Sequence, residues 1–145
     1  MRALLSVANR DGISALARDL LALGVEVFAT DGTRDHLAAD GIEVRPVSEL
    51  TGLPQLIGGQ VKTFHPAIYA GILARRDVQA QMDELAEQGI GQIDIVVVNV
   101  SPFAPAVGAQ LVPIDEASEM IDVGGAALLG AAARNGAGVA AVGSP

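Results

Sequence analysis

The hexapeptide Ile-Asp-Ile-Val-Val-Val at residues 93–98 decides the fold class, because it predicts a strand that is buried on both faces of a sheet. Parallel strands covered on both faces read as nearly continuous apolar runs, whereas half-exposed strands alternate apolar and polar residues. Shorter apolar runs predict further strands at residues 3–7, 25–30, 42–47 and 139–142. Apolar residues at helical spacing predict helices at 12–23, 33–40, 77–88, 114–120 and 124–135. This alternation predicts an α/β fold, a parallel sheet covered by helices on both faces.

Two stretches interrupt the alternation. Residues 48–74 are broken repeatedly by Gly and Pro and are long for a connection inside one domain, and long connections are usually functional. Residues 101–112 read as a second loop that contains Pro and Gly. In parallel sheets ligands bind outside the carboxyl ends of the strands, so we expect the functional site in the loops that follow the strands.

The composition excludes several classes of function. The chain has 145 residues, the size of one domain, and its lack of cysteine excludes disulfides, thiolate zinc sites and cysteine nucleophiles. The imidazoles are limited to His36 and His65, so no metal site is expected. A net charge of −8 argues against nucleic acid as a partner. We find no apolar run long enough for a membrane span and no signal peptide, and therefore expect a cytoplasmic protein without a membrane partner.

Loops after the first two predicted strands have the character of anion sites. In the loop Thr30-Asp31-Gly32-Thr33, Gly32 permits close approach of a ligand, and Thr30 and Thr33 offer hydroxyls beside free helical N–H groups. The same residues also read as a glycine turn with Thr33 as the helix N-cap. Arg10 follows the neighbouring strand and would add positive charge, or would lie in a solvated turn. Together the two loops favour a phosphate-like anion.

Polar side chains gather at three more places. Residues 58–66 carry Lys62, the only lysine, close to Thr63 and His65, and read either as a ligand-binding loop or as an ordinary surface loop. Asp122 precedes two glycines and a predicted helix, which suits a helix N-cap, a general base or a substrate-orienting carboxylate. Asn99 ends the buried strand and either reads an amide or hydroxyl of a ligand or forms a turn.

Six motifs lie in order along nearly the whole chain: Val47–Pro54, Val61–Pro66, Gly71–Arg76, Val96–Asn99, Ile121–Gly125 and Ala131–Asn135. Together they resemble the inosine monophosphate cyclohydrolase domain of the bifunctional purine-biosynthesis enzyme. The resemblance implies a methylglyoxal-synthase-like fold and closure of the formamido-imidazole-carboxamide ribotide into inosine monophosphate, with loss of water. It implies a nucleotide monophosphate substrate supplied by a separate formyltransferase, with no cofactor and no metal. The high apolar content of so short a chain leads us to expect a homodimer or higher homo-oligomer.

The resemblance also implies residue roles. Lys62 and Thr63 would lie beside the formyl and carboxamide groups, and Asp122 would orient or deprotonate the carboxamide nitrogen. We expect Lys62 and Arg134 to approach the same pocket as Asp122. The implied catalytic set is Lys62, Thr63, Asp122 and Arg134. The implied substrate-binding set is Arg10, Thr30, Gly32 and Thr33 around the 5′-phosphate, and Asn99, Ser101 and Gly124 near the base, with Gln60 and His65 as further candidates.

The chain departs from the family's pattern at some of these positions. The family usually has arginine, tyrosine, lysine and lysine where this chain has Gln60, Ser101, Arg134 and Arg10. Asp31 replaces the first glycine of the phosphate loop, where an acid repels an anion unless Arg10 or Arg34 pairs with it. Replacing tyrosine by Ser101 removes a hydroxyl that could stabilise a developing oxyanion.

Three hypotheses follow for a single cyclohydrolase-like domain over residues 1–145 without a formyltransferase domain. The first is a stand-alone cyclohydrolase. The second is ring closure of an analogous nucleotide in a specialised nucleoside pathway, with the departures marking a reshaped base pocket. The third is a non-catalytic nucleotide-binding module, which needs the phosphate loops but neither Lys62 nor Asp122.

Overall fold

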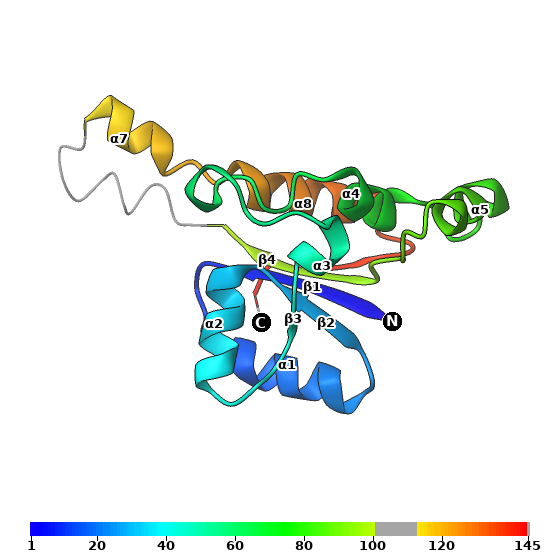
Figure 1. The fold of residues 1–145 in the computed structure, drawn as a ribbon, viewed down its shortest axis with the longest axis horizontal. Coiled ribbons are helices and arrows are strands. Elements are labelled where there is room, and N and C mark those ends of the chain that lie inside the picture. Colours follow the sequence, from blue (N-terminus) through cyan, green and yellow to red (C-terminus); the bar gives the residue numbers. More distant parts are fainter. Residues whose placement is uncertain (101–112, 145) are drawn as a thin grey trace.

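The sheet of this protein is five-stranded and entirely parallel (Figure 1). The computed structural model describes residues 1–100 and 113–144. Its strands are β1 (Arg2–Val7), β2 (Glu26–Ala29), β3 (Arg45–Pro46), β4 (Ile95–Asn99) and β5 (Ala140–Val142), in the order β3-β2-β1-β4-β5. The parallel sheet that the sequence predicts is therefore confirmed, and the loops after β1 and β2 lie side by side.

Helices cover both faces of the sheet (Figure 1). On one face lie α1 (Ile13–Ala22) and α2 (Asp31–Ala39), and on the other lie α4 (Pro66–Leu73) and α8 (Val123–Arg134). The other helices of the described residues are α3 (Ser48–Thr51), a 3₁₀ turn (Ile57–Gly59), α5 (Gln79–Glu87) and α7 (Ile114–Glu119). No helix of residues 1–100 and 113–144 is both long and apolar enough to cross a membrane.

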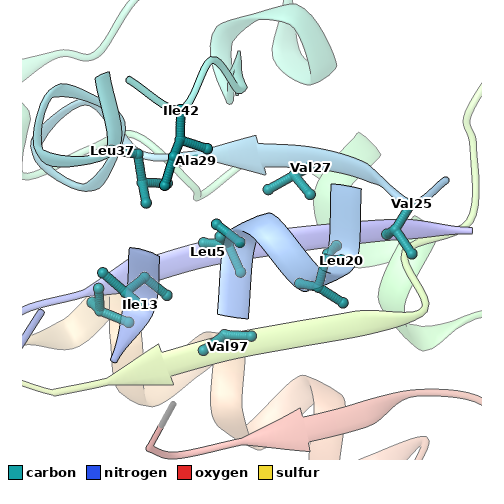
Figure 2. Close-up of a cluster of buried hydrophobic side chains, with 12 residues drawn as sticks. Leu5, Ile13, Leu20, Val25, Val27, Ala29, Leu37, Ile42 and Val97 are labelled. Carbon is teal, nitrogen blue, oxygen red and sulfur yellow. The ribbon is translucent and has the colours of Figure 1, made fainter. Parts of the chain in front are cut away.

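Strand alternation divides the apolar core into two layers. Leu5 and Val97 pack with α1 and α2 in the layer shown in Figure 2. Their neighbours Leu4 and Val96 point to the other face and pack with α4 and α8. Side chains alternate across a strand with a period of two, so a strand covered on both faces must be apolar at every position. The apolar run Ile95–Val98 within β4 meets this requirement.

Three elements differ from the sequence prediction. The third strand has only two residues, because it lies at the sheet edge and Pro46 has no N–H to donate to a ladder. Helix α2 begins at Asp31 rather than at Thr33, since Thr30 takes the N-cap position with extended backbone angles. Helix α4 lies in the stretch predicted to be irregular. It is apolar nearly all round and packs beside α8 on the same face of the sheet, so its sequence carries little helical periodicity.

The carboxyl end of α4 explains two of the sequence motifs. The Arg76 guanidinium donates to the carbonyl oxygens of Gly71 and Ile93, at 3.0 and 2.8 Å. The buried Asn135 amide donates to the carbonyls of Ile72 and Ala74, at 2.7 and 3.0 Å. The Asn135 bonds satisfy carbonyls that the end of α4 leaves without intrahelical partners, and the Arg76 bonds join this end to the segment before β4. The motifs around residues 71–76 and 131–135 therefore hold the fold together.

Candidate functional site

A pocket of about 520 Å³ opens at the carboxyl edge of the sheet, between the segment before α4 and the start of α8. This volume is in the range of small-molecule sites. Its wall comes from three parts of the chain that are distant in sequence: Ser6 of β1, residues 59–64, and residues 118–119 and 121–125. The fold thus brings the Lys62 motif and the Asp122 motif to one cavity, as the sequence analysis predicts.

Thr63 and Lys62, which both line this pocket, differ in how far they are exposed to solvent. Thr63 is buried, with 2% of its surface exposed, whereas Lys62 is exposed. The next residues are fixed by helix capping: Nδ1 of His65 accepts a hydrogen bond from the Ala67 N–H at 3.2 Å, and Pro66 occupies the first turn of α4. His65 therefore acts as a helix cap that fixes where the Lys62–Thr63 segment ends, and it does not line the main pocket.

Asp122 is the N-cap of α8. Its Oδ1 accepts a hydrogen bond from the Gly125 N–H at 2.7 Å, so the capping alternative is confirmed. The same carboxylate lines the pocket together with Lys62. Capping and substrate contact are compatible, because a carboxylate has about four acceptor sites and the cap uses one of them.

Gly124 lies between the Thr63 side and the Asp122 side of the pocket. A Cβ at this position would lie 3.5 Å from Oγ1 of Thr63 and 3.9 Å from Oδ1 of Asp122. With no side chain there, the backbone of the first turn of α8 faces the space between Thr63 and Asp122. This geometry suits a ligand that must reach both side chains.

Beside the pocket, the start of α2 forms the second candidate subsite. Nη2 of Arg10 lies 3.4 Å from the point where a Cβ of Gly32 would stand, so the guanidinium covers the first turn of α2. Thr30 makes no side-chain cap to this turn. The helix N-terminus therefore offers N–H groups together with a cation, which is the combination that binds phosphate. Asp122 already occupies the equivalent position on α8 with a negative charge.

The threonine hydroxyls of this loop have a role within the protein besides the one expected. Thr33 is buried, and its Oγ1 accepts a hydrogen bond from the Val7 N–H at 3.1 Å. Thr30 is buried and donates to Oγ of Ser6 at 3.3 Å. These hydroxyls form hydrogen bonds within the protein and fix α2 against β1, and the expectation that they also contact a ligand stays a prediction.

Ser6 is a pocket residue that sequence reasoning missed. It lines the main pocket and is hydrogen-bonded to Thr30, so it connects the pocket to the α2 subsite. The available signal was a polar residue within the apolar run of β1, at its carboxyl end.

Asp31 has no cation partner within residues 1–100 and 113–144. Arg34 pairs instead with Asp35, at 3.6 Å, and the Arg10 guanidinium lies over Gly32. No ion pair within the described residues therefore neutralises the Asp31 carboxylate in the phosphate loop.

Asn99 differs from its expected role. Its Oδ1 accepts hydrogen bonds from the N–H groups of Ala8 and Asn9, at 2.7 and 2.9 Å, and its Nδ2 donates to the Asn9 carbonyl at 2.8 Å. The side chain holds the loop after β1 and keeps only one N–H free. This arrangement resembles neither of the alternatives in the sequence analysis, a ligand-reading amide or a local turn.

Arg134 lies away from the pocket, and the prediction that it approaches Asp122 and Lys62 is wrong. It ends α8, whose 12 residues separate it from Asp122 by about 18 Å along the helix. It lines a different cavity with Arg75 and Arg76. Gln60 does line the main pocket, while Ser101 lies outside the described residues.

Comparisons with known proteins agree with this architecture. Residues 12–127 match the family described as "MGS-like domain". The chain is 50% identical over 135 residues to the "Bifunctional purine biosynthesis protein PurH" of Chloroflexus aurantiacus, covering 93% of this chain and 26% of that protein. It is 47% identical over 143 residues to the protein of the same name from Rhodopirellula baltica, covering 99% and 27%. The chain spans about a quarter of the length of these relatives.

A solved structure is also similar. The structure titled "Crystal structure of ForH" superposes with a TM-score of 0.79 at 39% sequence identity, covering 97% of this chain and 72% of that one. These matches confirm the resemblance that the sequence motifs predict.

Proposed function

The chain belongs to the MGS-like domain family, and on this basis we propose that it is an inosine monophosphate cyclohydrolase. It closes the formamido-imidazole-carboxamide ribotide into inosine monophosphate and releases one water. The observation that carries this proposal is that Lys62, Thr63 and Asp122 line one pocket beside the anion-binding start of α2. The curated relatives, which share up to half of the aligned residues, are named for purine biosynthesis, and this supports the proposed substrate class.

In the first step the carboxamide nitrogen attacks the formyl carbon. A C–N bond forms, and negative charge grows on the formyl oxygen until a proton reaches it. The Lys62 ammonium stabilises this oxygen, and Asp122 orients the attacking NH₂ group and accepts its proton. In the second step the new hydroxyl leaves as water, the former formamide nitrogen loses its proton, and the ring becomes aromatic.

Holding the two reacting groups in position supplies much of the catalytic effect on ring closure. The two reacting groups already belong to one molecule, so the protein needs to hold them in the reactive geometry and to stabilise the oxyanion. Arg10 and the first turn of α2 hold the 5′-phosphate, and the pocket between Thr63 and Gly124 holds the reacting groups. The chemistry forms one C–N bond and releases water, so it requires no redox cofactor. A formyltransferase activity supplies the substrate.

A second candidate reaction is ring closure of an analogous nucleotide. The observation that favours it is Gln60, which lines the pocket where the family's pattern has arginine. A neutral amide there replaces a cation, so the preferred base can differ from the standard one. The third hypothesis, a non-catalytic nucleotide-binding module, does not require Lys62 and Asp122 to lie in one pocket, so their shared location gives it no support.

A ring-closure assay, combined with a binding measurement, separates the three functions. Purified protein is mixed with the formylated purine ribotide, and the absorbance of the new purine ring is followed, with the wild-type chain heated to denaturation as the blank. Turnover supports the cyclohydrolase. Turnover restricted to an analogue with an altered base supports the second reaction, and calorimetric binding of the ribotide without turnover of either substrate supports the module.

A further inference from the structure

The side chain of Asn99 joins the most buried strand to the loop that carries Arg10. Asn99 pairs in register with Val7 at the end of β4, after three fully buried valines, Val96, Val97 and Val98. Its position is therefore fixed by the core of the sheet. From this position its amide makes three hydrogen bonds to the backbone of Ala8 and Asn9.

The loop is held on both sides of Arg10. Before Arg10, the backbone of Asn9 is bound to the Asn99 amide in both directions, as donor and as acceptor. After Arg10, the Asn9 side chain accepts from the Asp11 N–H at 3.0 Å, and the Ile13 N–H donates to the Arg10 carbonyl at 3.2 Å. The Arg10 backbone is thus restrained, although its side chain is exposed.

We propose that Asn99 is a positioning residue that holds Arg10 over the first turn of α2, so that a phosphomonoester meets a preformed cation. This inference rests on the proposed function only in taking the α2 turn as the phosphate subsite. An arginine fixed in advance loses less conformational entropy when the anion binds, so the clamp raises phosphate affinity without touching the ligand.

Two other roles for Asn99 lead to different measurements. If the amide contacts the base directly, its removal weakens a nucleoside as much as a nucleotide. If it only closes the end of β4, its removal lowers stability, but any change in phosphate affinity is independent of Arg10. The positioning role predicts that the effects of the two residues on phosphate affinity are coupled.

The experiment is a double-mutant cycle with inorganic phosphate, inosine monophosphate and inosine as probes, read by calorimetry or by amide chemical shifts. The variants are Asn99→Ala, Arg10→Ala and the double variant, with Tm measured for each. Asn135→Ala is the matched control. Its side-chain amide also binds the backbone, but it lies at the carboxyl end of α8, away from the pocket at the start of that helix. Asn99→Asp is the second variant, because it keeps the acceptor for Ala8 and Asn9, loses the donor to the Asn9 carbonyl and adds a negative charge near Arg10.

We expect Asn99→Ala to weaken phosphate and inosine monophosphate by about three- to tenfold and to leave inosine unchanged. In the Arg10→Ala background the same substitution should have no further effect. Asn99→Asp should weaken phosphate at least as much as Asn99→Ala, because its added charge repels the anion. Asn135→Ala should lower Tm without changing phosphate affinity.

Additive effects of the two substitutions would overturn the proposal, as would equal losses for inosine and its phosphate or unchanged phosphate affinity in Arg10→Ala. Failure of ring closure in the wild-type protein would overturn the proposed function alone, because the phosphate measurements do not depend on turnover.

Discussion

Oγ1 of Thr63 lies 3.5 Å from the point where a side chain on Gly124 would begin. Thr63 comes from the segment before α4 and Gly124 from the first turn of α8, 61 positions later in the chain. Both residues line the pocket. A Cβ at residue 124 would meet only ordinary contact distances, so the fold tolerates it, but the added methyl group would take up space in the pocket.

Gly124→Ala is expected to separate stability from binding. Its Cβ meets only ordinary contact distances, and alanine favours a helix over glycine, so the free energy of unfolding should rise by about 0.5–1 kcal/mol. The methyl group enters the space between Thr63 and Asp122, so ligand affinity should fall. The neighbouring Gly125→Ala is the contrast: its Cβ would lie 2.7 Å from Oδ2 of Asp122, so the cap must move and stability should drop. Thermal unfolding and nucleotide titration of both variants check this, and equal stability of the two would contradict it.

Asp122 is expected to show two separable roles. Asparagine caps helices as well as aspartate does, so Asp122→Asn should remain within about 1 kcal/mol of the wild type in stability. It cannot accept the carboxamide proton, so ring closure should fall by about 10²-fold or more. Asp122→Ala loses the cap as well and should cost about 1 kcal/mol further. Turnover in Asp122→Asn at the wild-type level would limit Asp122 to capping.

Lys62→Ala is expected to lower the ring-closure rate by about 10²- to 10³-fold, the range for removal of one oxyanion donor. Nucleotide affinity should change much less, because the phosphate is held at α2. Lys62→Arg should recover part of the rate, since its planar guanidinium cannot place the charge at the same point. Arg18→Ala, which removes an exposed cation from α1, is the control. Steady-state kinetics decide: a Lys62→Ala variant within threefold of the wild type would show that Lys62 is not catalytic.

Asp31→Asn is expected to tighten phosphate binding by about fivefold, because it removes a negative charge from the first turn of α2. The same charge stabilises the helix N-terminus, so the free energy of unfolding should fall by about 0.3–1 kcal/mol. Asp19→Asn makes the same charge change at an exposed position of α1 and should leave phosphate affinity unchanged. Phosphate titrations of both variants in low salt measure the effect. Weaker binding in Asp31→Asn would place the anion elsewhere.

Glu26 makes stability depend on acid pH. A hydrogen bond from Arg2, aided by the charge of Arg45, holds the pKa of the Glu26 carboxyl below its ordinary value. A lowered carboxyl pKa contributes stability above the ordinary pKa, and this contribution is lost as the pH falls through the folded-state pKa. Glu26→Gln should therefore lower Tm near neutral pH, and its difference from the wild type should shrink toward about pH 3. Glu43→Gln, at an exposed position, is the control. A Tm difference between Glu26→Gln and the wild type that grows as the pH falls would contradict the prediction.

The local structure of this protein was largely readable from its sequence. The apolar run at residues 93–98 predicted the central strand, and the alternation of strands with periodic helices predicted a parallel sheet with two covered faces. Helix α4 could not be predicted, because the periodicity signal requires a polar face and α4 is apolar nearly all round where it packs beside α8. The shared pocket of Lys62 and Asp122 followed only from the family resemblance, since nothing in the spacing of these residues states that they meet.

Periodicity and composition are local properties, and they determined the fold class, the buried strand and the loops at its carboxyl edge. Tertiary structure alone decided which polar groups remain available. The hydroxyls of Thr30 and Thr33 are used inside the protein, the Asn99 amide is used on the loop before Arg10, and Arg134 is carried to the far end of α8. The physical reason is that each donor or acceptor site that a polar group uses within the protein is no longer open to a ligand, and the partners that use it lie far away in the sequence.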